Sequence, residues 1–217
     1  MSSFDKTGNL VSVVPEDSLS PGNVEPLLRG RFGRPYGYFE RCESTQRKLA
    51  ADAPEGAVAV AEEQTAGRGR LGRKWLAPRR TSVLVSVNLR PEIATPRLPE
   101  LSLVAGAAVA DAIAAVTGLH PEVRFPNDVL IGGRKVAGIL AEARDDRVVL
   151  GIGINVNMDA AELPKALDTP ATSLQVETGA RVDRATLLAA ILERLESAYD
   201  AWLNEARSGE NPRRGPL

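Results

Sequence analysis

The segment that most constrains the fold is residues 64–75, which read QTAGRGRLGRKW between two apolar, strand-like segments at 57–61 and 83–89. Its three glycines allow close backbone approach, so the amide N–H groups of such a loop can surround a ligand. Its arginines add planar forks that suit phosphate or carboxylate. The residue types support two interpretations, an anion-binding loop or a solvated basic turn.

Residues 67–72 also match G-x-G-x-x-G, the dinucleotide-binding fingerprint. That fingerprint requires a strand before the glycines and a helix that opens at the third glycine. A strand is predicted before them, but Trp75, Pro78 and Thr81 interrupt the residues that follow, and another strand comes next. A P-loop would need a lysine and a serine or threonine directly after the glycines, which this segment lacks. The context disfavours both motifs.

Composition limits the classes of partner. The net charge is −1, so the basic loop is a local concentration of charge, and binding of nucleic acid through a whole basic face is disfavoured. The single cysteine, Cys42, fits a reducing cytoplasm, and with one histidine, His120, it makes a His/Cys metal site implausible. No secretory signal is visible, and no apolar run reaches the ~20 residues that span a bilayer. We therefore expect a cytoplasmic protein without DNA or membrane partners and without a tightly held metal.

Hydrophobic periodicity and turn residues predict the order of the elements. Helices are expected at 99–117, at 45–52 and from Asp183 onward, and the first should be buried on most sides, with apolar residues at Leu103, Ala107, Ala110 and Ala114. Strands are expected at 36–41, 57–64, 81–89, 122–125, 129–131, 135–143 and 147–156. Gly132 and Gly133 are expected to form a hairpin turn that extends into a meander, and residues 159–175 are expected to be rich in loops. Asp183 is expected to cap the last helix, whose apolar residues fall on one face: Leu187, Leu188, Ile191, Leu195, Tyr199 and Trp202. Strands that pair mainly with their neighbours, with a few helices grouped around them, indicate an α+β fold with a mixed, largely antiparallel sheet.

The chain divides by composition into three parts. Residues 1–35 are rich in Ser, Gly, Pro and Asn and are expected to form a flexible or draped lead-in with a short helix near 24–29. Residues 36–207 should form the main domain. Residues 208–217 are polar and proline-bearing, which predicts a disordered tail.

Two further stretches could carry chemistry. Lys135 enters an apolar segment, so it should be oriented by a partner, for which Asp128 is a candidate; alternatively it snorkels from the strand end, and residues 126–128 form only a tight turn. Gly151 and Gly153 within a strand suggest close approach of a ligand or another backbone, and Asn155 at the strand end can present an amide donor and acceptor. Taken alone, this last stretch fits a bulge followed by an Asx-turn better than a ligand site.

Together these stretches resemble the catalytic domain of the biotin protein ligases, also called biotin–[acetyl-CoA-carboxylase] ligases. The matching segments appear in the family's order and spacing: ESTQ at 43–46, the run at 64–75, FPND at 125–128, KVAGIL at 135–140 and GIGIN at 151–155. The resemblance implies the α+β fold shared with class II aminoacyl-tRNA synthetases, with residues 36–207 as a biotin- and ATP-binding catalytic domain. It also implies two half-reactions, in which biotin and Mg-ATP form biotinyl-5′-AMP and a lysine of a biotin carboxyl carrier protein then takes the biotinyl group.

The resemblance assigns roles residue by residue. The catalytic residues would be Arg68, Arg70, Lys135 and Asp128, the last organising Lys135 or the acceptor lysine. Biotin would contact Ser44, Thr45, Gln46, Gln64, Gly67, Arg68, Gly69, Arg70, Lys135 and Gly138. ATP would contact Arg68, Arg70, Arg73, Trp75, Asn127, Lys135 and Asn155. Because a carboxylate must attack a phosphate, positive charge that brings two anions together is the main catalytic requirement. The run at 64–75 would then be a lid, poorly ordered until ligand arrives.

The chain departs from the family pattern in several places. Phe125 stands where the family usually has Trp, and Gln46 stands where Asn is common. The C-terminal all-β domain of many members does not follow the last helix, so either this member works without it or the sequence is truncated. The DNA-binding N-terminal domain of repressor-type members is not expected either, and a homodimer is left open. The alternatives are a lipoate- or octanoate-type ligase or transferase, a non-catalytic biotin-binding regulator, and a nucleic-acid adaptor.

Overall fold

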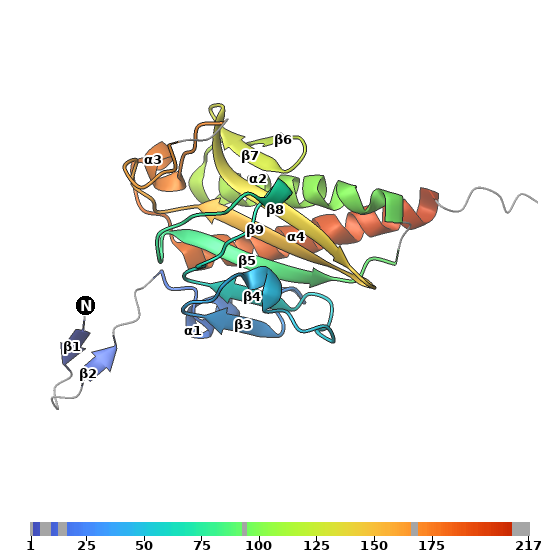
Figure 1. Cartoon of the computed structure of the whole chain (residues 1–217), viewed down its shortest axis with the longest axis horizontal. Helices are drawn as coiled ribbons and strands as arrows, with labels where there is room; N and C mark the ends of the chain where they lie inside the picture. The colour runs from blue at the N-terminus through green and yellow to red at the C-terminus, as the bar shows by residue number, and fades with distance from the viewer. Residues whose placement is uncertain (1, 5–9, 13–16, 93–94, 166–168, 210–217) are drawn as a thin grey trace, which may run out of the picture.

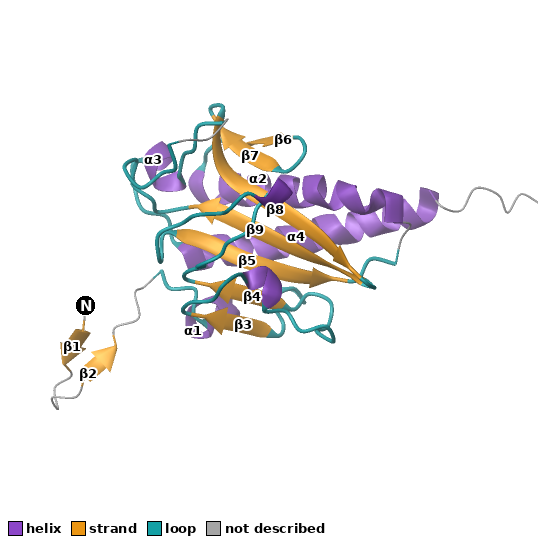
Figure 2. Ribbon diagram, in the orientation of Figure 1, coloured by secondary structure: helices purple, strands orange, loops and turns teal. Residues whose placement is uncertain are grey.

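A mixed seven-stranded sheet dominates the computed structural model, which describes residues 2–4, 10–12, 17–92, 95–165 and 169–209 (Figures 1 and 2). The strand order is β3-β4-β5-β9-β8-β7-β6, and only the β3–β4 pair is parallel. The strands are β3 (Tyr36–Phe39), β4 (Val58–Ala61), β5 (Ser82–Leu89), β6 (Glu122–Arg124), β7 (Asp128–Ile131), β8 (Arg134–Arg144) and β9 (Arg147–Asn155). Strands β1 (Ser2–Phe4) and β2 (Leu10–Ser12) form a separate antiparallel pair. The expected α+β class is confirmed.

The second half of the sheet is an antiparallel meander, as the sequence predicts. Strand β7 turns into β8 through Gly132 and Gly133, whose φ angles of 54° and 75° are those of a two-residue hairpin turn that favours glycine. Strand β8 then pairs with β9 from Ala137 to Arg144. The pairing of β7 with β8 contains a register shift at Val129/Leu130, so Lys135 and Gly138 face the same side of the sheet.

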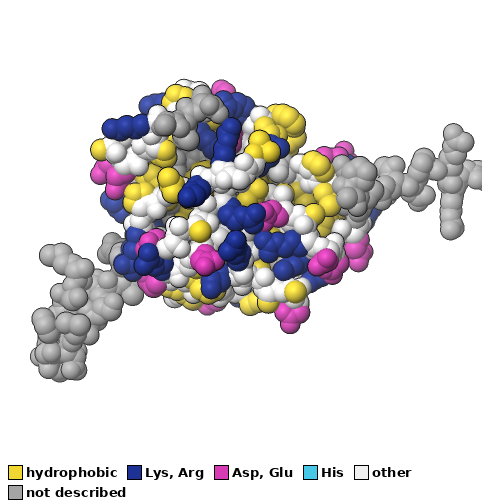
Figure 3. Space-filling view, viewed as in Figure 1, with side chains coloured by type: hydrophobic (Ala, Val, Ile, Leu, Met, Phe, Trp, Pro, Cys, Tyr) yellow, Lys and Arg dark blue, Asp and Glu magenta, His cyan; other side chains and the backbone are white. Residues whose placement is uncertain are grey.

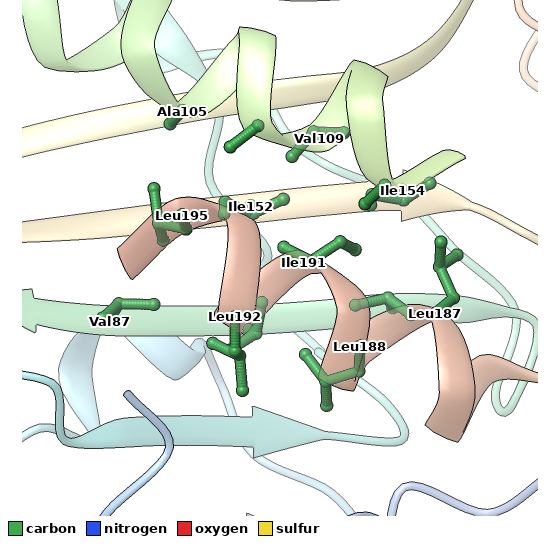
Figure 4. Packing of buried hydrophobic residues seen from close by; sticks show 14 of the residues in the cluster. Val87, Ala105, Val109, Ile152, Ile154, Leu187, Leu188, Ile191, Leu192 and Leu195 are labelled. Carbon is green, nitrogen blue, oxygen red and sulfur yellow. The ribbon is translucent and has the colours of Figure 1, made fainter. Parts of the chain in front are cut away.

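Helices α2 (Leu101–Thr117) and α4 (Arg184–Gly209) lie side by side on one face of the sheet (Figures 1 and 4). In Figure 4, Leu188, Ile191 and Leu195 of α4 lie over the strands that carry Val87 and Ile152. The predicted apolar face of α4 is confirmed, since Leu187, Leu188, Ile191, Leu195, Tyr199 and Trp202 are all buried. Asp183 Oδ1 accepts the Thr186 N–H at 2.6 Å, so the predicted N-cap is confirmed as well.

The expectation that α2 is buried on most sides is only partly met, because Leu103, Ala107 and Ala115 are exposed on one side of the helix. Of Leu103, Ala107, Ala110 and Ala114, only Ala110 is buried. Helix α2 contacts α4 and strands β6–β8. Its buried residues are Leu101, Ala105, Gly106, Ala108, Val109, Ala110, Ala112 and Ile113. A helix that is apolar on all sides gives no sequence signal for which side faces the sheet. The segment Arg97–Thr117 is long and apolar enough to cross a membrane, but it packs against α4 and the sheet as a core helix.

Two local expectations also change. The helix expected at 45–52 is wrong, because the structure has only a 3-10 turn, Thr45–Arg47, whose Thr45 and Gln46 side chains turn inward. The loop expected at 159–175 contains the start of α3 (Leu174–Thr178), capped by Ser173 Oγ, which accepts the Val176 N–H at 3.1 Å.

Described segments near both ends of the chain contribute residues to the core of the main domain. Near the N-terminus, α1 (Pro21–Val24) and a 3-10 turn (Glu25–Leu27) replace the helix expected at 24–29. Leu19 and Phe32 are buried in the same core as the sheet. Helix α4 includes Ser208, where the tail was expected to begin, and residues 210–217 lie outside the described residues. The three-part division stays a prediction.

A buried ion cluster fixes the strand that leads into the 64–75 loop. Arg184 and Glu62 are both fully buried, and Arg184 Nη1 lies 2.7 Å from Glu62 Oε2. Arg184 Nε also lies 3.2 Å from Asp17 Oδ2, and Glu62 Oε1 accepts the Leu19 N–H at 2.8 Å. The cluster therefore ties the N-terminal segment, the end of β4 and helix α4 together, two residues before Gln64.

Candidate active site

The segments singled out in the sequence meet at one cavity of about 820 Å³ on the sheet face opposite α2 and α4, where the 64–75 loop crosses in front of the strands (Figure 1). Lys and Arg side chains lie across the middle of this face (Figure 3). The cavity is lined by every residue of the predicted site except Gly67: Ser44, Thr45, Gln46, Gln64, Arg68, Gly69, Arg70, Arg73, Trp75, Asn127, Asp128, Lys135, Gly138 and Asn155. Its size suits a small-molecule ligand. The residues come together as expected, and their individual roles stay predictions.

The loop itself forms a short hairpin. The Trp75 N–H donates to Gly67 O at 3.0 Å, and the Gly69 N–H donates to the carbonyl of Arg73 at 2.8 Å. A Cβ at Gly67 would lie 2.4 Å from Trp75 O, so this glycine is needed to close the hairpin and does not line the cavity. Leu71 at the tip has a φ of 56° and is 88% exposed, an unfavourable backbone and an exposed apolar side chain at the cavity mouth.

Two strand glycines form the seat of Trp75. Gly138 on β8 lies opposite Gly153 on β9 in the sheet. A Cβ at Gly138 would lie 2.9 Å from the Trp75 ring, and one at Gly153 would lie 2.6 Å from it. The close approach suggested by the glycines in β9 is present, but the approaching group at Gly153 is the indole side chain of the loop and not a backbone or a ligand. Trp75 Nε1 is buried without a hydrogen-bond partner among the described residues.

A polar group closes the other end of the cavity, around Thr45. Gln64 Oε1 accepts both the Thr45 N–H, at 2.7 Å, and the Thr45 hydroxyl, at 3.1 Å. The buried Ser86 Oγ lies 2.8 Å from Thr45 Oγ1. Because the hydroxyl proton of Thr45 goes to Gln64, Ser86 must donate to Thr45, which leaves Thr45 with an acceptor lone pair. Ser86 was missed in the sequence, since an alternating strand contains several serines with no mark to distinguish them.

Two further polar atoms at the cavity have no hydrogen-bond partner within the described ranges of the chain. Gln46 Nε2 donates to Leu140 O at 2.9 Å, whereas Gln46 Oε1 is buried without a hydrogen bond in the part of the chain that the structure describes. Ser44 Oγ is also buried without a hydrogen bond to any described residue. The absence of a Cβ at Gly151 gives Gln46 its room, since a Cβ there would lie 2.7 Å from Gln46 Nε2. Buried polar atoms without partners are rare in folded proteins, and in a cavity they indicate groups that a ligand satisfies.

Lys135 has the partner that the sequence suggested. Its Nζ lies 2.6 Å from Asp128 Oδ1 and 5.8 Å from the centroid of a Trp75 ring. Arg124 Nη2 lies 3.1 Å from the other oxygen of Asp128, so one carboxylate holds two cations at the cavity wall. Arg124 was missed because it precedes the recognised turn. The cluster carries a net positive charge, which suits an anionic ligand.

The loop arginines face carbonyl and carboxylate oxygens of the protein. Arg68 forms a two-point ion pair with Glu142 on β8, with Nη1–Oε2 at 2.9 Å and Nη2–Oε1 at 2.8 Å. Glu142 also accepts a hydrogen bond from Arg144 at 3.0 Å. Arg70 donates to the side chain of Asn127 at 3.4 Å. Glu142 had no sequence signal, because its contact spans 74 residues of chain.

The remaining candidates are the amide of Asn155, the thiol of Cys42 and possible metal ligands. Asn155 donates its amide to Thr172 O at 3.0 Å, which leaves its oxygen as the group that can meet a ligand. Cys42 is buried, and burial raises the pKa of its thiol, so it is not an activated nucleophile. Among the described residues, no group of three or more His, Cys, Asp or Glu side chains could hold a metal ion.

Comparison with known proteins identifies the family. Residues 38–159 match the model of the biotin/lipoate A/B protein ligase family. The chain is 42% identical to the Bifunctional ligase/repressor BirA of Bacillus subtilis over 175 residues, 76% of this chain and 54% of that protein. It is 41% identical to the biotin–[acetyl-CoA-carboxylase] ligase of Mycobacterium tuberculosis over 203 residues, 87% of this chain and 75% of that protein. The chain thus spans about half the length of the curated bacillar relatives that it matches.

A solved structure shows the same fold. The biotin protein ligase from Aquifex aeolicus in complex with biotin and ATP superposes with a TM-score of 0.72 and 35% identity, over 78% of this chain and 72% of that one. The family match, the two relatives and this superposition agree with the cavity and its motifs. This chain belongs to the biotin/lipoate A/B protein ligase family.

Proposed function

We propose that this chain is a biotin–protein ligase, which activates biotin with Mg-ATP to biotinyl-5′-AMP and transfers the biotinyl group to a lysine of a biotin carboxyl carrier protein. The names of the relatives and the ligands of the Aquifex aeolicus structure support this proposal. The family also contains lipoate ligases, so the choice of substrate depends on the cavity.

The observation that carries the choice is the set of polar atoms without protein partners. The Ser44 hydroxyl can donate to the carbonyl of a cyclic urea, and Gln46 Oε1 can accept from one of its ring N–H groups. The remaining lone pair of Thr45 can accept from the other. A dithiolane ring offers no such groups, so it would leave these atoms buried and unpaired, at about 1–3 kcal/mol each. The cavity therefore favours biotin over lipoate.

The other end of the cavity suits the anionic part of the reaction. A carboxylate oxygen of biotin attacks the α-phosphorus of ATP, a new O–P bond forms, and the bond to pyrophosphate breaks. Lys135 and Arg124 hold positive charge beside this centre, and Asp128 keeps the two cations together. Because the Asp128 carboxylate contacts both cations, we assign it to organising Lys135. The acceptor lysine then attacks the carbonyl carbon of the mixed anhydride and AMP leaves.

The roles proposed for Gly138 and Trp75 require a movement. Gly138 is proposed to leave room for the biotin ring, but the Trp75 indole occupies that space in this structure. We therefore propose that Trp75 leaves its seat when biotin enters and afterwards covers the adenylate. Mg²⁺ enters with ATP as part of the substrate, and we place the reaction in the cytoplasm. A homodimer stays a prediction.

The test is ATP–pyrophosphate exchange with biotin, lipoate or octanoate as the acid. Exchange that depends on biotin supports the proposal, and exchange only with lipoate or octanoate would replace it with the lipoate-type function. Biotin binding by calorimetry without exchange would indicate a regulator. Lys135→Ala should depress exchange by ~2–4 kcal/mol of barrier, because it removes a charged contact at the reacting centre. Normal exchange in that variant would contradict the role of Lys135.

A further inference from the structure

The position of Arg68 raises a question about how the loop reaches its substrate. Arg68 lines the cavity, yet both of its terminal guanidinium nitrogens contact the oxygens of Glu142. Glu142 is itself held by Arg144, and its side chain is only 21% exposed. A two-point pair with a carboxylate is the same contact that Arg68 would make with the carboxylate of a bound acid.

The two contacts lie at different positions along β8, and Glu142 itself does not line the cavity. Gly138, Leu140 and Glu142 alternate along β8 and therefore share one face of the strand. Glu142 lies four residues beyond Gly138, which is about 13 Å along the strand. The cations of the reacting end lie beside Gly138, since a Cβ there would be 3.4 Å from Lys135 Nζ. One guanidinium group cannot pair with Glu142 and with a carboxylate beside Lys135 at the same time.

We infer that Glu142 is a positioning residue that holds Arg68 away from the reacting end and competes with the substrate carboxylate for it. This inference rests on the proposed function, because it takes the carboxylate of biotin as the competitor. Binding of biotin breaks the Arg68–Glu142 pair, and part of the affinity of Arg68 for the substrate is offset by the loss of that pair. The loop therefore stays docked on β8 until a free carboxylate is present.

Calorimetric titration of biotin and of biotinol, in which a hydroxymethyl group replaces the carboxylate, tests this competition. In Glu142→Gln the competing charge is gone, so biotin should bind about two- to fivefold tighter than to the wild type, the range of one partly exposed ion pair. Biotinol should bind both proteins equally. As a control, Asp145→Asn removes a negative charge from the turn between β8 and β9 and should leave the affinities for biotin and biotinol unchanged. In an Arg68→Ala background, Glu142→Gln should have no effect on biotin binding.

The outcomes separate this inference from the proposed function. If the wild type binds neither ligand, the proposed function is wrong. If the wild type binds biotin but Glu142→Gln binds it equally or more weakly, Glu142 does not compete with the substrate. A gain of the same size for biotinol would also overturn the inference, because the effect would not act through the carboxylate. Melting temperatures of the variants show that each protein is folded.

Discussion

Replacing Ser44 with alanine should make the protein more stable and a poorer binder of biotin. Ser44 is 1% exposed and its hydroxyl has no partner among the described residues, so folding removes it from water without compensation. Such a group costs about 1–3 kcal/mol. For a chain of this size each kcal/mol shifts the melting temperature by about 2–4 °C, so Ser44→Ala should melt roughly 2–12 °C higher. Biotin should bind about two- to tenfold more weakly, since one hydrogen bond is lost.

A matched control is available on strand β5. Ser82 Oγ is likewise buried without a hydrogen-bond partner in the described part of the chain, but Ser82 does not line the cavity. Ser82→Ala should therefore also melt at a higher temperature, while its affinity for biotin stays that of the wild type. Differential scanning calorimetry and biotin titration of both variants measure the two effects. A Ser44→Ala protein with unchanged biotin affinity would refute the assignment of this hydroxyl to the ligand.

Four further predictions follow from the structure. Gly153→Ala places a methyl 2.6 Å from Trp75, so it should displace the indole and change the tryptophan emission of the free protein, whereas Gly22→Ala, with nothing described within 4 Å of its Cβ, should leave the emission unchanged; the same emission in Gly153→Ala as in the wild type would contradict the seat. Arg70→Gly should release biotinyl-AMP faster while biotin still binds, which trapping of the free adenylate measures; unchanged retention would contradict the lid. Arg184→Met should cost ~3–5 kcal/mol in urea unfolding, because it leaves Glu62 buried and unpaired; a loss below 1 kcal/mol would contradict this. The Tyr38 hydroxyl, together with Arg79 and Arg80, lowers the pKa of Glu40 to about 2. The ionised Glu40 therefore contributes stability above pH 4.5, and this contribution is lost as the pH falls toward 2. Glu40→Gln should make the free energy of unfolding depend less on pH in this range.

The sequence was informative wherever a local pattern determines the structure. The Gly132–Gly133 turn, the Asp183 cap and the strand glycines act through backbone geometry and short-range hydrogen bonds, and each was predicted. The pairing of Lys135 with Asp128 was predicted as well, because a half-buried ammonium needs a nearby carboxylate.

Contacts between residues far apart in the sequence could not be predicted from local patterns. The face of α2 depends on where α4 and the sheet lie, and its uniformly apolar sequence fits several orientations. Ser86 and Glu142 meet Thr45 and Arg68 only after the sheet is assembled, so neither stands out in the sequence. The seat of Trp75 is a similar case, since the glycines predicted a close approach but not the group that approaches.

The most direct test of the central claim is transfer to an acceptor. The chain is incubated with Mg-ATP, a biotin carboxyl carrier domain and either biotin or lipoate, and the intact mass of the carrier is measured. We predict a carrier heavier by one biotinyl group, with the modification on its acceptor lysine and no addition of lipoate. A carrier that gains a lipoyl group, or that stays unmodified while the chain still binds biotin, would contradict the account.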